Sequence, residues 1–244
     1  FGHGVMGGGL GALFISVLFA AARYELIPRS AAFAVTAVIA GAGVVLALRR
    51  EAPLLAYLGF LGGYMAPAIL GENRDALEGL AGWLLLLHAG LFACLWRRRW
   101  VGLDLVAVTA AAIYYGAWSD RFMVPARTGA AGGALVALTL ATLALALLPG
   151  LLRRRPVGPT GLLTAVLTGC AASWAAFELF HPEHRALVGA GLLGLTAVYA
   201  VAGVLRRRDD SARFPEAPVL DGAAVAALAG AVPAFLEGAG VAPV

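Results

Sequence analysis

The stretch "YLGFLGGYMAPAILGENRD", residues 57–75, determines how the rest of the sequence is interpreted. It begins as an apolar run of the kind that crosses a membrane, yet it contains the pair Gly62-Gly63 and, shortly after it, Pro67. Glycine and proline are both poor helix formers in water. Proline has no N–H, and its ring crowds the carbonyl of Gly63, so this carbonyl loses its normal helical partner. The sequence therefore predicts a membrane-spanning helix that is kinked or unwound between Gly62 and Pro67.

The composition of the whole chain indicates a multi-span membrane protein. Of its 244 residues, 61% are hydrophobic and only 13% are charged, and the mean hydropathy is +0.86. A soluble domain carries about 25% charged residues. The charges are clustered, so long uncharged runs lie between them. The arginines lie in these short clusters and not on one soluble face, which argues against a nucleic-acid-binding protein.

Eight apolar runs are long enough to cross a bilayer, whose hydrocarbon core of about 30 Å requires roughly 20 residues. Because backbone groups cannot stay unpaired in lipid, we expect these runs to be helices. We therefore expect an all-α, polytopic transmembrane helical bundle over residues 1–218, with a weaker, incomplete ninth span in 219–244. The eight spans are expected at about residues 5–22, 31–48, 52–71, 77–96, 101–118, 129–149, 159–179 and 186–205.

The arginines predict how the chain is threaded through the membrane. Clusters of two or three follow every second run, and together with Arg213 they hold 12 of the 18 arginines, whereas the alternate connections hold 6. The positive-inside rule places the clusters in the cytoplasm. Residue 1 is then cytoplasmic, and the chain crosses as four helical hairpins. Trp96 and Trp100 flank the second cluster and Trp118 lies at the opposite end of its run, where amphipathic rings prefer the interface.

Further features suggest the cellular setting. The chain lacks lysine and is rich in Ala, Gly, Leu and Arg, which favours a GC-rich genome and hence a bacterial inner membrane. It begins at Phe1 without a charged segment and cleavage site typical of a signal peptide. We expect it to be a piece of a longer protein. Its expected partners are the lipid bilayer and other transmembrane helices of that parent, and not nucleic acid.

Two interpretations of the glycine-proline break remain open. Several transporters use a broken helix to build a binding site at membrane depth. Alternatively, Gly59 and Gly63 form a small-xxx-small packing face, and Pro67 merely kinks the helix near its outer end. The second interpretation is the more ordinary one, since Gly and Pro are common in membrane helices. The packing partner would be the first run, whose "GVMGGGLG" offers Gly4, Gly7, Gly8 and Gly11.

His88 is the one ionisable side chain near the middle of a predicted span. Such residues are costly in lipid and are functional candidates, although a neutral histidine hydrogen-bonded between helices is the more ordinary case. A neutral imidazole still needs partners. We expect His88 to face the third or fifth run, near the Tyr64 hydroxyl, Thr109 or the carbonyl freed by Pro67. In a transporter, His88→Leu should then reduce transport while the protein still inserts. The candidate binding residues are Gly62, Gly63, Tyr64, Pro67 and His88.

The remaining polar motifs favour neither an enzyme nor a cofactor site. His181, Glu183 and His184 share the outer loop "FHPEHR", but their spacing is not that of HExxH, and an exposed polar turn is the simpler interpretation. Cys94 and Cys170 lie inside apolar runs without a CxxC partner. Paired acid and base groups at one depth are missing. We therefore expect no catalytic residues, no metal and no cofactor.

The order of these features resembles that of a known family. A glycine-rich first span "GGGLGALF", the turn "YELIP", the span "LGGYMAP" and the exit "WRRRW" together resemble a bacterial family of predicted multi-span membrane proteins. The family is known as domain of unknown function 2339, and the resemblance covers about residues 1–118. It implies membrane class and location. The family has no established activity, so the resemblance transfers no site.

Two classes of function stay open at this point. The first is a transporter or channel for a small or lipid-like envelope substrate, with the broken third span at its site. The second is a non-catalytic membrane scaffold that organises partner proteins. The glycine-proline break favours transport, whereas the scarcity of central polar residues favours a scaffold or a lipid-handling role. A water-accessible cavity that reaches Gly63 and His88 would favour the first class.

Overall fold

The computed structural model describes residues 2–71, 75–98, 100–153, 157–179, 185–208 and 217–238. These residues form helices joined by short connections, and no strand occurs among them. The predicted all-α, polytopic helical bundle is therefore confirmed. The elements are α1 (Gly2–Ala22), α2 (Arg29–Arg50), α3 (Pro53–Leu70), α4 (Leu77–Arg97), α5 (Leu103–Phe122), the 3-10 turn η1 (Pro125–Arg127), α6 (Thr128–Leu152), α7 (Pro159–Leu179), α8 (Arg185–Arg208) and α9 (Ala217–Gly238).

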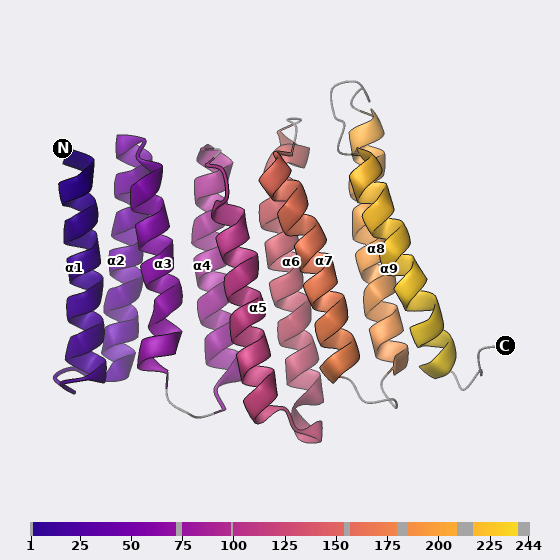
Figure 1. Cartoon of the computed structure of the whole chain (residues 1–244), viewed down its shortest axis with the longest axis horizontal. Coiled ribbons are helices and arrows are strands. Elements are labelled where there is room, and N and C mark those ends of the chain that lie inside the picture. The colour runs from indigo at the N-terminus through magenta and orange to yellow at the C-terminus, as the bar shows by residue number, and fades with distance from the viewer. Residues whose placement is uncertain are drawn as a thin grey trace. The chain divides into compact units, whose positions relative to one another are not determined.

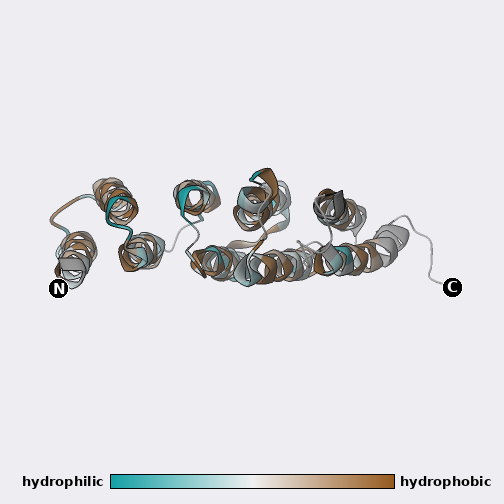
Figure 2. Cartoon of the chain, turned by 90° about the horizontal axis from the view of Figure 1, so that it is seen from above, coloured by the Kyte–Doolittle hydropathy of each residue, from teal (hydrophilic) through white to brown (hydrophobic). Residues whose placement is uncertain are grey.

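The chain divides into two compact units, Phe1–Val106 and Ala107–Val244. In the first unit, α3 packs against α2, α1 and α4, and α2 also contacts α1 and α4 (Figure 1). Seen from above, α2 and α4 lie in one row and α1 and α3 in the other (Figure 2). Arg98 forms an ion pair with Glu51. The first two arginine clusters therefore lie at the same end of this unit, as the hairpin arrangement predicts.

Small residues allow α3 to approach α2 closely. A Cβ added to Gly59 would lie 3.4 Å from the carbonyl oxygen of Ala40 and 3.8 Å from the Cα of Gly43. Glycines that bring two backbones together in this way are typical of tightly packed membrane helices. The expected packing of the first run on α3 is confirmed, but of its four glycines only Gly7 takes part. A Cβ added to Gly7 would lie 3.0 Å from Leu58, whereas nothing lies within 4 Å of a Cβ added to Gly4, Gly8 or Gly11.

The second unit contains most of α5 and the elements from η1 to α9. Here α6 packs on α7, α8 packs along α9, and α7 also contacts α8 and α9. Tyr199 of α8 joins two of these helices, since its hydroxyl donates a hydrogen bond to the Ala165 carbonyl of α7 over 2.5 Å. A Cβ added to Gly169 would lie 2.7 Å from the same hydroxyl oxygen, so this glycine provides the space for the tyrosine.

Seven of the described helices are long and apolar enough to cross a membrane: α1 to α4 and α6 to α8. By length and hydropathy, the predicted number of firm spans, eight, is therefore one more than these helices provide. The fifth predicted run falls on α5, whose apolar character is reduced by Asp104 near its start and by Asp120 and Arg121 near its end. The apolar part of α9, Pro218–Ala231, is shorter than the seven.

We predict that α5 nevertheless crosses the membrane. Its 20 residues extend about 30 Å along the axis, which matches the hydrocarbon core. Single cysteines replacing the exposed Val101 and Val124, in a chain with Cys94→Ala and Cys170→Ala, should react with an impermeant thiol reagent from opposite sides of a vesicle. Reaction of both cysteines from the same side would show that α5 does not cross.

Candidate functional site

The helix that contains Pro67 is continuous. α3 runs from Pro53 to Leu70 with the proline inside it, so the predicted unwinding is wrong, whereas the predicted kink stays a prediction. Pro67 offers no N–H to the Gly63 carbonyl, and the replacement donor comes from the next helix. The indole Nε1–H of Trp83 donates to the Gly63 carbonyl oxygen over 3.0 Å. The carbonyl that Pro67 frees is therefore satisfied by a side chain within the protein.

The two glycines before the proline make room for large side chains. A Cβ on Gly62 would lie 2.6 Å from two atoms of the Phe14 ring in α1. A Cβ on Gly63 would lie 2.9 Å from Leu87 of α4. Real Cβ atoms essentially never approach other heavy atoms so closely. The pair Gly62-Gly63 is thus explained by packing on both sides of α3.

His88 lies one helical turn beyond Leu84 and is only 2% exposed. Its Nδ1 is 2.7 Å from the Leu84 carbonyl oxygen and 3.4 Å from the Tyr64 hydroxyl. Because a carbonyl only accepts, Nδ1 carries the proton and donates to Leu84. The rings of Tyr64 and His88 are perpendicular, with centroids 6.2 Å apart. The prediction that His88 faces the third span beside Tyr64 is confirmed, whereas Thr109 belongs to the second unit.

Three of the five predicted site residues, Gly63, Tyr64 and His88, are buried together at the contact between α3 and α4. Gly62 faces Phe14 of α1 instead, and Pro67 lies one turn further along α3. The contact consists of packed side chains and the hydrogen bond from the Trp83 indole to the Gly63 carbonyl, and none of the five residues lines the cavity described next. Their role in binding stays a prediction. The loop residues His181, Glu183 and His184 lie outside the described residues.

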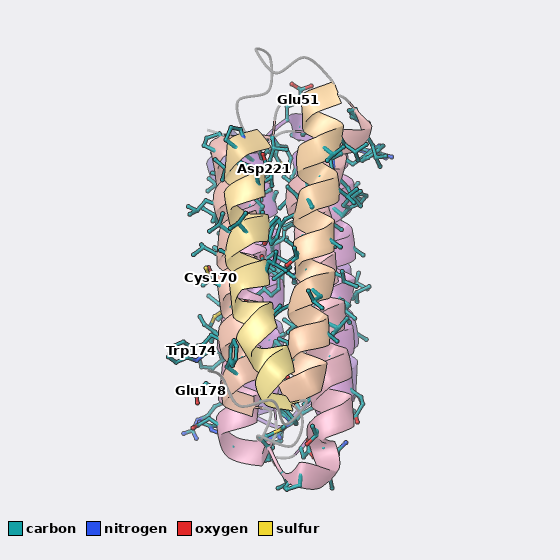
Figure 3. The ribbon with its side chains drawn as sticks, turned by 90° about the vertical axis from the view of Figure 1, so that its right-hand side faces the viewer. Glu51, Cys170, Trp174, Glu178 and Asp221 are labelled. Atoms are coloured by element: carbon teal, nitrogen blue, oxygen red, sulfur yellow. The ribbon has the colours of Figure 1, made fainter. Side chains whose placement is uncertain are left out.

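A cavity of about 560 Å³ lies in the second unit, between α5, α6 and α7. We call it the acidic cavity, because two carboxylates, Asp120 and Glu178, belong to its described lining. Both are exposed, as is Trp174. Figure 3 shows Trp174 and Glu178 one above the other along one edge of the view. These residues form the mouth of the acidic cavity.

The inner part of the acidic cavity is apolar apart from hydroxyl groups. Val108, Ala111 and Leu138 line it together with the buried Thr142 and Thr168. Each threonine donates to the carbonyl four residues earlier in its own helix, Leu138 and Thr164 respectively. These internal hydrogen bonds lower the cost of a hydroxyl at this depth. The cavity thus changes from charged and aromatic at its mouth to largely apolar inside.

Sequence reasoning missed this cavity. Asp120 and Glu178 each stand near the end of an apolar run, which is also the ordinary place for a solvated charge. Their common signal is an acidic residue close to an interfacial tryptophan, Trp118 in one helix and Trp174 in the other. That α5 and α7 flank one cavity depends on helix packing, which the sequence pattern does not encode.

The fold and its apolar helices define a multi-pass membrane protein, and such helices contact the lipid bilayer directly. Comparison with known families agrees. A family model described as "Predicted membrane protein (DUF2339)" matches residues 1–243, and the chain belongs to this family. The match extends well beyond residues 1–118, on which the resemblance in sequence rested. No curated protein and no solved structure matches the chain.

We predict that Trp83→Phe destabilises the first unit by about 1–3 kcal/mol, because the Gly63 carbonyl is left without a donor. The effect should shrink when Pro67→Ala is present, since residue 67 then supplies an N–H to the same carbonyl. Thermal unfolding of the wild type, Trp83→Phe, Pro67→Ala and the double variant, in one detergent, measures how far the two substitutions depend on each other. Trp174→Phe, at an exposed tryptophan, is the matched control. If Trp83→Phe destabilises the protein equally in the presence and in the absence of Pro67→Ala, the idea that Trp83 replaces the N–H missing at Pro67 is refuted.

We also predict that Gly62→Ala is destabilising. The added Cβ overlaps the Phe14 ring, and overpacking of this kind costs about 1–3 kcal/mol. Gly82→Ala serves as the control, because nothing lies within 4 Å of a Cβ at that position of α4. The control should be neutral or stabilising, since alanine is the better helix former. Similar melting temperatures for the two variants would contradict the packing account.

Proposed function

We propose that the protein is a transporter for a lipid-like envelope substrate, and that the acidic cavity receives the polar head of that substrate. One observation carries the proposal: the cavity is charged at its mouth and largely apolar inside. A lipid-like molecule has the same division, with a polar head and a hydrocarbon part. An enzymatic role is not proposed, since the substrate is moved and no bond is made or broken.

The dimensions of the acidic cavity support this match. Along α5 its lining extends from Asp120 to Val108, a rise of about 18 Å at 1.5 Å per residue. One leaflet of the hydrocarbon core is about 15 Å thick. The volume of about 560 Å³ falls within the range typical of small-molecule sites, about 300–1,000 Å³. With its head group at Asp120, a lipid-like substrate would thus place its hydrocarbon chain within one leaflet of the bilayer.

The mouth of the cavity favours a head group that carries positive charge. Asp120 and Glu178 attract a cation, and Trp174 offers an aromatic face on which an ammonium group gains a cation–π interaction. Exposed charges contribute modestly, up to about 1 kcal/mol each. They are suited to selecting among head groups, while the apolar part of the cavity supplies most of the affinity.

We place the protein in the bacterial cytoplasmic membrane with residue 1 on the cytoplasmic side. The distribution of 12 and 6 arginines supports this orientation. The mouth of the acidic cavity then opens on the outer side, because Asp120 precedes the connection between the fifth and sixth runs and Glu178 the connection between the seventh and eighth. An outward-facing mouth suits an envelope substrate.

A non-catalytic scaffold is the second candidate, and one observation favours it. Gly4, Gly8 and Gly11 lie along α1, and a Cβ on any of them would meet nothing within 4 Å. A face of small residues allows another helix to approach closely. In this alternative, α1 packs against other transmembrane helices of a longer parent protein, and the first unit organises them.

The transport proposal predicts a preference among lipids. In vesicles that contain the purified chain, a phosphatidylethanolamine with a fluorescent acyl chain should change leaflets faster than the matching anionic phosphatidylglycerol. The double variant Asp120→Asn/Glu178→Gln should slow the first lipid about fivefold, since the loss of about 0.5 kcal/mol of attraction at each of the two carboxylates corresponds to that factor. Quenching of the outer leaflet's fluorescence by dithionite measures both rates.

Glu25→Gln is the control for this experiment, because it removes a carboxylate that is exposed and lies outside the acidic cavity. It should leave both rates unchanged. Vesicles in which the wild-type chain moves neither lipid would contradict transport and leave the scaffold as the better account. Equal rates for wild type and the double variant would remove the acidic cavity from the mechanism.

A further inference from the structure

A second cavity of the second unit lies between α6, α7 and α8 and has a volume of about 880 Å³. We call it the glycine groove. Seen from above, α6 and α8 lie in one row and α7 in the other (Figure 2), and α7 contributes Ala172 and Ala176 to the lining. Its described lining contains no ionisable residue, and its polar side chains are Thr128 and Thr139. The groove is thus far less polar than the acidic cavity.

The glycines of this groove differ from those of α3. Gly129 and Gly133 of α6 and Gly191 and Gly194 of α8 line the groove, and nothing lies within 4 Å of a Cβ added to any of them. At Gly62, by contrast, a neighbouring ring occupies the space that a side chain would take. Packing between the described helices therefore explains the α3 glycines but not these four. Their effect is to keep open a space lined mostly by apolar groups.

The membrane location indicates what enters that space. α6, α7 and α8 are all among the helices able to cross a membrane, so the open side of the groove borders hydrocarbon and not water. On α6 the lining extends from Thr128 to Leu143, a rise of about 22 Å. This exceeds one leaflet of the hydrocarbon core, about 15 Å. A full-length acyl chain fits along the groove, parallel to α6.

We propose that the glycine groove binds one hydrocarbon chain of a bilayer lipid. Leu135 and Leu192 provide the apolar walls, and the four glycines provide the width. Each methylene that leaves the mobile bilayer for a fixed groove gains contacts with these walls. This inference goes beyond the proposed transport, because the groove would bind a lipid chain even if that lipid stayed there permanently and was never moved.

The groove and the acidic cavity share a wall. Leu135, Thr139 and Ala172 line both of them. A lipid chain in the groove therefore contacts residues that also line the acidic cavity. Occupancy of the groove supports the α6–α7 contact from one side and sets the width of the cavity on the other. A change that fills the groove should leave the charged mouth, Asp120 and Glu178, unaltered.

The test fills the groove with protein atoms. In Gly133→Leu/Gly194→Leu, two leucine side chains occupy the space assigned to the lipid chain, with no clash at the Cβ positions. The full chain, reconstituted with palmitoyl-oleoyl phosphatidylethanolamine and re-extracted in detergent, should retain one lipid in native mass spectrometry. The double variant should lose most of this lipid, because the leucine side chains take the place of the chain against the groove walls. Gly82→Leu adds the same bulk at an open position of α4 and should retain the lipid normally.

A second measurement does not depend on folding of the variant. A phosphatidylethanolamine with a photoreactive diazirine in its chain, irradiated with the wild-type chain, should label the groove residues Val136, Leu140 and Leu195. Labelling confined to other exposed helix faces would overturn the proposal. Equal lipid retention by the wild type and by Gly133→Leu/Gly194→Leu would overturn it as well. Lipid retention by a chain that moves no lipid would support the groove and count against transport.

Discussion

In hydrocarbon there is no water to pair with a backbone carbonyl, so each one must find a donor within the protein. The Gly63 carbonyl is the clearest case, because Pro67 removes its helical donor. Trp83 supplies the replacement from α4, and its ring is held edge-on to Phe33 of α2, with centroids 5.1 Å apart. One hydrogen bond thus connects α3 to α4, and one aromatic contact connects the donor to α2. The arrangement of the first unit depends on this exchange.

Glycine serves two different purposes in this protein. Around α3 it admits a neighbour: Gly59 admits the α2 backbone, and Gly62 admits the Phe14 ring. In α6 and α8 it leaves space open, as at Gly133 and Gly194. The same residue type therefore either brings a neighbour close or leaves a space open, depending on what packs opposite it.

Apolar length and arginine spacing were enough to predict the helices, their hairpins and the common end of the first two arginine clusters. Those predictions rest on bilayer thickness and on local charge, which act within one helix or one loop. The position of His88 beside Tyr64 also followed from the sequence, since consecutive antiparallel helices bring equal depths together. The capping of Gly63 by Trp83 did not, because it depends on the rotation of α4 about its own axis.

The cavities of the second unit were not predictable for a related reason. Asp120 and Glu178 are far apart in sequence, and only the packing of α5, α6 and α7 places both at one mouth. The sequence pattern also assigned function to the most unusual residues, the Gly62–Pro67 break. In the structure those residues satisfy packing and hydrogen bonding, whereas ordinary residues such as Thr168 and Ala172 line the open space.

The central claim is that the mouth of the acidic cavity is open to water while the α3–α4 contact is closed. Reaction of single cysteines with a charged, membrane-impermeant methanethiosulfonate tests both halves at once, in a chain with Cys94→Ala and Cys170→Ala. Ser119→Cys, beside Asp120 at the mouth, should react rapidly, and Leu87→Cys, which replaces the side chain beside Gly63, should not react in the folded protein. Rapid reaction of Leu87→Cys, or protection of Ser119→Cys, would contradict the account and return the functional site to the third span.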